Sequence, residues 1–185
     1  MVARLHVMLL RIYQRLPTKG RRLVVRTLSP CFTVGSMCFI ERSDGALLLV
    51  RLVYRRQWGV PGGLLKRGED ATEAAHREVF EEVGVAVELC GEPAVVVAPV
   101  PQRVDVVYRA RIAPRPGGVL DGRGETPRPC SPEIMEVGWF PVDALPELQH
   151  ETASGLVALA RSSAASSSPP VRGREPARAV GDEHS

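Results

Sequence analysis

Residues 58–85 read WGVPGGLLKRGEDATEAAHREVFEEVGV, and this stretch decides the fold of the chain. Asp70 is a good helix N-cap, and Glu73, three residues later, can complete a capping box. Small and aliphatic residues recur at helical spacing, at Ala71, Ala75, Val79 and Val83. Gly84 follows and favours a left-handed helix end. The stretch therefore predicts a glycine-rich loop that leads into one amphipathic helix.

Three acidic residues of this helix point to a metal site. Glu78, Glu81 and Glu82 stand at positions i, i+3 and i+4, so their carboxylates are expected on one side of the helix. Like charges at this spacing repel, and only Arg77 is close enough in sequence to offset them. A divalent cation would remove the repulsion, and ligands that are all oxygen favour Mg2+ or Mn2+.

The same residues resemble the signature box of the Nudix hydrolases, Gly-x5-Glu-x7-Arg-Glu-U-x-Glu-Glu-x-Gly-U, in which U is aliphatic. The sequence from Gly63 to Val85 matches every specified position. At roughly 7% usage per residue type, the fixed positions would match by chance about once in 10^8 windows. The resemblance implies an α/β fold, the Nudix-like α/β/α sandwich with a central mixed sheet. It also implies Mg2+-dependent hydrolysis of a diphosphate linked to another group.

The resemblance carries residue roles with it. Glu78 and Glu82 are implied as direct metal ligands, Glu81 as a ligand or the catalytic base, and the carbonyl of Gly63 as a backbone ligand. Glu69 is expected to act through water on the metal or to hold the loop. Arg77 is expected to pair with a glutamate and hold it in place.

The catalytic base stays open at this level. It is either a box glutamate or a carboxylate from a later loop, for which Asp105, Glu133 and Glu136 are the candidates. Carboxylates as close as those of the box titrate as a coupled set, and one pKa can be raised before metal binds.

The residues that would bind substrate are less well defined. Arg51 and Arg55 precede the box and suit phosphate contacts. Tyr108 is a candidate for stacking on a base, whereas Trp58 and Phe80 are expected in the core. We expect a small nucleoside diphosphate derivative as substrate. Nucleoside triphosphates, oxidised nucleotides, nucleotide sugars, ADP-ribose and dinucleotides all remain possible.

Two other functions compete with this interpretation. One is a non-catalytic nucleotide-sensing Nudix domain, although a protein that only binds has no need of the complete glutamate set. The other is an RNA 5′-end pyrophosphohydrolase, for which a basic stripe on the domain itself would be expected. The basic residues gather instead before the first acid, Glu41: Arg4, Arg11, Arg15, Lys19, Arg21, Arg22 and Arg26. Nucleic acid is therefore not the expected partner.

Length and composition predict one globular domain with tails. The chain has 185 residues, of which 44% are hydrophobic and 24% charged. We expect a catalytic domain over residues 29–160, preceded by a basic amphipathic helix and linker over residues 1–28. A Ser/Pro/Arg-rich tail over residues 161–185 is expected to be disordered.

The N-terminal helix is predicted from Arg4 to Leu16 and ends at Pro17. Its apolar run is too short for a signal peptide or a transmembrane span. Docking on the domain or on the partner subunit of a homodimer is expected, and binding to a membrane surface is the alternative. The four cysteines form no CxxC pair, which indicates reduced thiols in the cytoplasm.

Alternating patterns predict strands at residues 32–40, 46–54, 85–89, 94–98, 104–112 and 134–141. The first two are expected to form a hairpin through the turn at Asp44 and Gly45. A long loop over residues 115–132, a short helix over 142–148 and a last helix over 151–160 complete the expectation.

Overall fold

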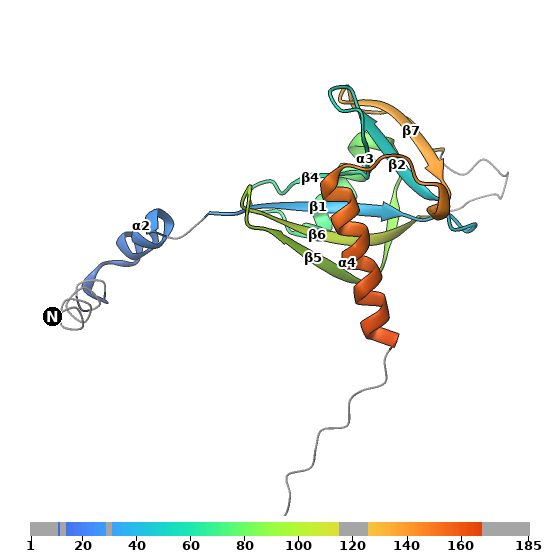
Figure 1. Cartoon of the computed structure of the whole chain (residues 1–185). Helices are drawn as coiled ribbons and strands as arrows, with labels where there is room; N and C mark the ends of the chain where they lie inside the picture. The colour runs from blue at the N-terminus through green and yellow to red at the C-terminus, as the bar shows by residue number, and fades with distance from the viewer. Residues whose placement is uncertain (1–10, 12–13, 29–30, 115–125, 168–185) are drawn as a thin grey trace, which may run out of the picture.

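The computed structural model describes residues 11, 14–28, 31–114 and 126–167. Figure 1 shows its elements, which in chain order are α2 (Thr18–Leu28), β1 (Thr33–Ile40), β2 (Leu47–Leu52), β3 (Trp58–Gly59), β4 (Gly62–Leu64), α3 (Ala71–Val83), β5 (Val87–Ala98), β6 (Arg103–Ile112), β7 (Ile134–Phe140), the 3-10 helix η1 (Val142–Ala144) and α4 (His150–Ser167).

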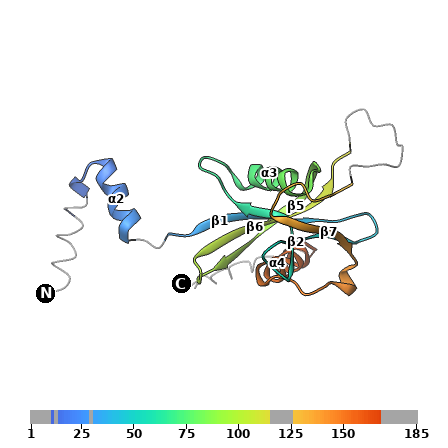
Figure 2. The ribbon, with the colours of Figure 1, turned by 90° about the horizontal axis from the view of Figure 1, so that it is seen from above.

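Two sheets form the centre of the fold. The larger is mixed, with the strand order β4-β1-β6-β5. Strands β1 and β6 are parallel, whereas the pairs β1–β4 and β5–β6 are antiparallel. The smaller sheet is antiparallel, with the order β3-β2-β7. Helices α3 and α4 lie on opposite sides of the larger sheet (Figure 2). The predicted α/β/α arrangement with a mixed central sheet is confirmed.

Helix α3 begins and ends where the sequence predicted. The side chain of Asp70 accepts bonds from the backbone N–H groups of Thr72 and Glu73, and Glu73 bonds back to complete the capping box. Gly84 closes the helix in the left-handed conformation, with φ of 73°. These caps fix the register of the helix and therefore the directions in which its glutamates project.

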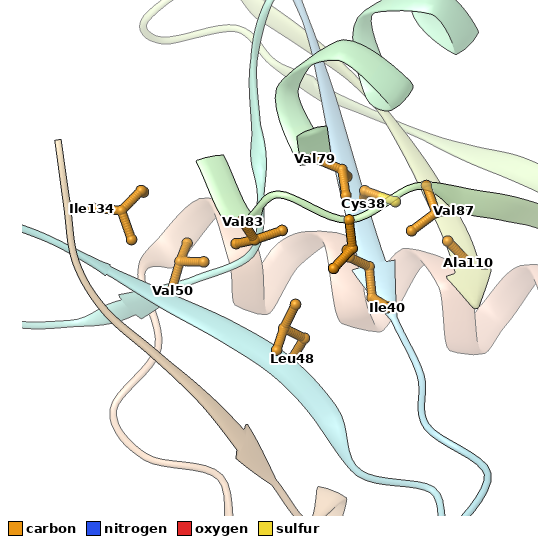
Figure 3. Packing of buried hydrophobic residues seen from close by; sticks show 10 residues of the cluster. Cys38, Ile40, Leu48, Val50, Val79, Val83, Val87, Ala110 and Ile134 are labelled. Carbon is orange, nitrogen blue, oxygen red and sulfur yellow. The ribbon is translucent and has the colours of Figure 1, made fainter. Parts of the chain in front are cut away.

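The apolar face of α3 packs into the core. Val79 and Val83 are fully buried and belong to a cluster with residues of both sheets. Figure 3 shows them beside Ile40 of β1 and Leu48 of β2. A second cluster on the other side of the larger sheet includes Leu159 of α4. Burial of apolar area on both sides of the sheet holds the two helices in place.

The predicted β1–β2 hairpin is wrong. The turn at Gly45 exists, with φ of 84°, but the strands meet only at an isolated bridge between Glu41 and Leu47. They then diverge into different sheets. The reason is that β1 is an interior strand with β4 and β6 on its two sides, so it offers β2 no free edge.

Other boundaries also differ from expectation. The two strands predicted over 85–89 and 94–98 form one strand, β5, with a register shift between Cys90 and Ala94. A β-bulge lets one strand continue through residues that do not follow the alternating pattern. The short helix predicted over 142–148 is only the 3-10 turn Val142–Ala144. The hairpin, the strand break and the short helix all depended on contacts that local pattern does not report.

The ends of the chain show two more differences. Residues 18–28, predicted as linker, form α2, because the carbonyl of Pro17 accepts a bond from the N–H of Arg21 and starts a new helix. Helix α4 reaches Ser167 rather than Ala160. Most of the predicted helix over 4–16, residues 115–125 of the predicted loop and residues 168–185 of the predicted tail lie outside the described residues. Within the described part, no helix combines the length and apolarity that crossing a bilayer requires.

Candidate functional site

A cavity of about 520 Å³ opens beside the glycine-rich turn that precedes α3. The turn, α3, the end of β2, the start of β6 and the first turn of α4 all contribute to its walls. Its lining comprises Met37, Val50, Leu52, Tyr54, Arg55, Gly59, Val60, Gly62, Gly63, Leu64, Glu78, Glu82, Arg103, Glu133, Gln149, Glu151 and Thr152.

Glu82 is a partly buried carboxylate of this cavity. Its Oε2 accepts a bond from the backbone N–H of Gly62 at 3.3 Å. The pKa of Glu82 is raised to about 8, mainly by burial and to a smaller extent by the negative charges of Glu78, Glu133 and Glu81, while the bond from Gly62 opposes the rise. An ionised Glu82 therefore lacks a compensating positive charge.

Glu78 lies directly against the glycine-rich turn. A Cβ added to Gly63 would stand 2.3 Å from Oε1 of Glu78, so only glycine leaves room for this carboxylate. Its side chain is 15% exposed and accepts a bond from Nη1 of Arg77 at 2.7 Å. One turn of α3 thus brings Glu78 and Glu82 to the same cavity.

Arg77 ties the loop to the helix. Its Nε and Nη2 donate to the two carboxylate oxygens of Glu69, at 2.6 and 2.8 Å, and Nη2 also reaches the carbonyl of Leu64 at 3.3 Å. The bonds from Arg77 and from the backbone N–H of Lys66 lower the pKa of Glu69 to about 2. Arg77 therefore holds both Glu69 and Glu78, and the predicted pairing of this arginine with a glutamate is confirmed.

Glu81 points elsewhere. Its side chain is 50% exposed and bonds to Nζ of Lys66 and Nη1 of Arg77, both at 3.3 Å. It is not among the residues that line the cavity. Across the described ranges, no group of three or more His, Cys, Asp or Glu side chains has a geometry that could hold a metal ion. Of the predicted trio, the structure brings Glu78 and Glu82 to the cavity and places Glu81 outside its lining.

The chemistry of this pair fits a hard divalent cation. Two carboxylates and a nearby backbone carbonyl at Gly63 are oxygen donors of the kind that Mg2+ prefers. Mg2+ is commonly held by one or two carboxylates, with substrate phosphates and water completing its shell. The pKa of Glu82 is raised mainly by burial and also by the neighbouring carboxylates, and a bound cation would offset both effects. The residues present therefore fit Mg2+ without a third carboxylate.

The later carboxylates separate into three environments. Asp105 is 4% exposed and accepts two bonds from Nε of Arg103, at 2.8 and 2.9 Å. Glu136 pairs with Arg51 across β2 and β7. Glu133 alone of the three lines the cavity, and its Oε2 accepts a bond from the hydroxyl of Tyr54 at 3.2 Å. Of the candidates for a base outside the box, the geometry retains Glu133.

Of the predicted substrate-binding residues, only Arg55 lines the cavity. Arg55 lines the cavity, 3.7 Å from Glu151. Arg51 does not line it, because Glu136 and the ring of Trp58 engage its guanidinium. Tyr108 is 8% exposed, and its hydroxyl lies 3.2 Å from the hydroxyl of Thr72, so it is not placed to stack on a base.

The two aromatic residues expected in the core differ. Trp58 is partly buried and packs edge-on against Phe140, with 4.7 Å between the ring centroids. Phe80 is 64% exposed, so its placement in the core was wrong. Phe80 lies between Val79 and Glu81, on the side of α3 that faces away from the sheet.

Five polar residues of the cavity were not predicted from the sequence: Tyr54, Arg103, Gln149, Glu151 and Thr152. Tyr54 lies only a few residues before the glycine-rich stretch, whereas Arg103 on β6 and the three residues at the start of α4 are distant in sequence and are brought to the cavity by the fold. Arg103 lies just before the predicted strand over residues 104–112, and the observed strand β6 begins at Arg103. A second hollow of about 500 Å³, lined by Cys90, Arg109 and Leu159 among others, contains no residue of the box.

Comparisons with known proteins identify the family of the chain. The NUDIX domain matches residues 32–159. NAD-capped RNA hydrolase NudC of Chromobacterium violaceum is 32% identical over 129 residues, which are 64% of this chain and 45% of that protein. The 8-oxo-dGDP phosphatase NUDT18 of Mus musculus is 30% identical over 118 residues, or 63% of this chain and 34% of that protein.

This chain thus spans less than half the length of these two relatives. Among solved structures, the MutT NUDIX hydrolase from Burkholderia pseudomallei superposes with a TM-score of 0.53 at 28% identity, covering 70% of this chain and 99% of that one. The domain match covers most of the chain. The chain therefore belongs to the NUDIX domain family, as the resemblance of its sequence predicted.

Proposed function

We propose that this protein is a Mg2+-dependent hydrolase that cleaves the pyrophosphate bond of a nucleoside diphosphate linked to another moiety. One observation carries the proposal. Glu82 is a partly buried carboxylate with a raised pKa, and it shares a cavity with Glu78 and Glu133. Such a concentration of negative charge is costly unless a cation compensates it.

Glu78 and Glu82 would hold the cation. When bound, Mg2+ supplies neutralisation of the non-bridging phosphate oxygens and stabilisation of the leaving phosphate. The protein keeps both carboxylates in position before substrate arrives. The N–H of Gly62 orients Glu82, and Arg77 orients Glu78 while Glu69 anchors Arg77.

Glu133 is our candidate for the general base. It lines the cavity, and its Oε2 is engaged by the hydroxyl of Tyr54. Its Oε1 would then accept the proton of the attacking water. The burial of Asp105 and the pairing of Glu136 support this choice over the other two later carboxylates.

The substrate would lie between the carboxylates and the start of α4. Arg55 would bind a phosphate oxygen, and the ring of Tyr54, which is 65% exposed at the cavity, would offer a stacking surface for a base. Among the described residues that line the cavity, Tyr54 is the single aromatic side chain. Cys38, Cys90 and Cys130 carry free thiols, which supports a reducing compartment such as the cytoplasm.

A substrate panel tests the proposal. The purified chain should be incubated with Mg2+ or Mn2+ and ADP-ribose, nucleotide sugars, nucleoside triphosphates, 8-oxo-dGDP, NAD and NAD-capped RNA, with release of phosphate or monophosphate as the readout. 8-oxo-dGDP and NAD-capped RNA come from the names of the two relatives, and NAD is the free dinucleotide that matches the cap. Turnover of a nucleoside diphosphate derivative that stops with EDTA supports the proposal.

Glu82→Gln is the decisive variant for this assay. We expect it to lower kcat by about a hundredfold or more while the melting profile stays cooperative. Glu88→Gln, on the exposed side of β5, is the control and should leave turnover unchanged. Turnover of Glu82→Gln near the wild-type rate would remove the carboxylate from the mechanism.

The panel also decides between the main proposal and the RNA alternative. A preference for capped RNA over the free dinucleotide, lost steeply as salt is raised, would favour an RNA 5′-end hydrolase. Binding of a nucleotide without turnover under every metal condition would favour the sensor.

A further inference from the structure

Arg103 and Asp105 form a salt bridge at the wall of the cavity. Both stand on β6, two residues apart, so their side chains leave the same face of the strand. Nη2 of Arg103 lies 2.8 Å from Oδ1 of Asp105, and Nε donates to both oxygens. Arg103 lines the cavity, whereas Asp105 is 4% exposed and does not. The buried carboxylate of Asp105 therefore holds the guanidinium of Arg103 from the side away from the cavity.

Gly35 of β1 makes room for this pair. It lies opposite Asp105 in the parallel register of β1 and β6. A Cβ on Gly35 would stand 2.4 Å from Oδ1 of Asp105 and 2.9 Å from Nη2 of Arg103. Both contacts are closer than real Cβ atoms tolerate, so a side chain here would displace the pair.

The position of the missing Cβ of Gly35 also lies close to the glycine-rich turn. The Cβ that Gly35 lacks would also lie 3.3 Å from the carbonyl oxygen of Gly63, and Gly63 itself contacts the carboxylate of Glu78. Arg103 therefore approaches the glycine-rich turn from the side of β1, while Glu78 approaches it from α3. A positive group and a negative group lie on either side of one backbone segment.

Arg103 is suited to bind an anion. A guanidinium carries five N–H donors, and Asp105 engages the edge formed by Nε and Nη2. The donors of Nη1 and the outer N–H of Nη2 remain for a ligand, in a fork whose orientation is fixed in advance. A fixed arginine binds phosphate oxygens with charge-assisted bonds and loses little conformational entropy in doing so.

We propose that Arg103 binds a non-bridging phosphate oxygen of the substrate, with Asp105 as its positioning residue and Gly35 as the space that admits the pair. This assignment rests on the proposed function, because it names the anion contact of the same cavity. It also gives Asp105 a role other than that of the base.

Steady-state kinetics with the best substrate of the panel test the assignment. Arg103→Gln should raise KM by about ten- to a hundredfold, as expected for a lost charge-assisted bond, with a smaller change in kcat. Arg103→Lys keeps the charge but loses the fork, so its KM should fall between those of wild type and Arg103→Gln. Arg111→Gln, exposed on the same strand, is the matched control and should leave KM unchanged.

Two further variants test the positioning role without touching Arg103. Asp105→Asn removes the charge that holds the guanidinium, and Gly35→Ala displaces the pair with no change of charge. Both should raise KM for the nucleotide. A KM within twofold of wild type in Arg103→Gln and Gly35→Ala, with folding intact by thermal melting, would overturn the proposal.

A binding measurement separates this inference from the proposed function. Calorimetry in EDTA with ADP and with adenosine requires no turnover. Arg103→Lys should weaken binding of ADP and leave binding of adenosine unchanged, which identifies a phosphate contact. Equal weakening for both ligands, or for neither, would contradict the assignment. An inactive wild type that still shows the ADP difference would refute only the hydrolase.

Discussion

The carboxylate of Glu78 occupies the space that a side chain on residue 63 would fill, because a Cβ on Gly63 would stand 2.3 Å from its Oε1 and 2.6 Å from its carboxyl carbon. Gly63 is required here for close approach and not for an unusual backbone angle, since positive φ is recorded at Gly45, Gly68, Gly84 and Gly91 instead. The position of the Glu78 carboxylate therefore depends on the absence of a side chain at residue 63.

Gly63→Ala should separate the two residues and weaken the metal site. We expect Mg2+ affinity and kcat/KM to fall by about ten- to a hundredfold, as for other changes that misplace a metal ligand. The melting temperature should change little, because Gly63 is partly exposed and lies on the edge strand β4. Calorimetric titration with Mg2+ measures the first effect.

Gly20→Ala is the control for that substitution. The nearest atoms to its added Cβ are 3.6 Å away, an ordinary contact in α2. Metal affinity of Gly63→Ala equal to that of Gly20→Ala would show that Glu78 does not need its present position.

Glu82 should make the stability of the metal-free protein depend on pH. Its folded-state pKa of about 8 is above its ordinary value of 4.5, so between these values the folded protein holds a proton that the unfolded chain has lost. This contribution to the free energy of unfolding is fully present below about pH 4.5 and is lost as the pH rises through about 8. Thermal melts in EDTA over this window, wild type against Glu82→Gln, isolate it.

Bound Mg2+ should reverse this dependence of stability on pH. Because binding requires the ionised carboxylate, the rise in melting temperature on adding Mg2+ should grow from about pH 5 to about pH 8. In Glu82→Gln, the melting temperature should fall much less with rising pH in EDTA, and it should rise much less on adding Mg2+. Parallel pH profiles for the two proteins would exclude Glu82 as the titrating group.

Glu133 and Glu136 offer a matched pair for the catalytic base. Glu133→Gln should lower kcat by about a hundredfold or more, since a general base contributes 10²- to 10⁴-fold, and should leave KM close to wild type. Glu136→Gln only removes the exposed pair with Arg51 and should keep full activity. Rate profiles against pH distinguish loss of a base from loss of substrate binding. If the two variants have equal activity, the base must be sought in the box.

Arg77→Lys should weaken both the loop and the site. Lysine cannot reproduce the two bonds to Glu69 together with the bond to Glu78. We expect the free energy of unfolding to fall by about 1–2 kcal/mol, the order expected for hydrogen bonds to charged groups. Chemical denaturation measures this, and kcat should fall as Glu78 loses its orientation.

Arg67→Lys serves as the reference, because Arg67 is exposed in the same loop. A stability change of Arg77→Lys no larger than that of Arg67→Lys would mean that the network around Arg77 does not hold the loop.

Sequence alone determined the parts of this protein that depend on local chemistry. Asp70, Glu73 and Gly84 specify both ends of α3 through bonds within a few residues, and the structure has these caps as predicted. The burial of Val79 and Val83 followed from helical periodicity. The family followed from fixed spacing in the box, and the domain match confirmed it.

Tertiary structure decided everything that depends on which segments meet. Spacing placed Glu81 with its neighbours, but Lys66 and Arg77 draw it to the outside, and only the packed helix shows which carboxylates reach the cavity. Equally, Arg103 is a strand residue far from the box until the parallel pairing of β1 and β6 sets Asp105 against Gly35. Backbone caps act over one turn of helix, whereas a binding site is assembled by pairings between distant strands that local sequence does not encode.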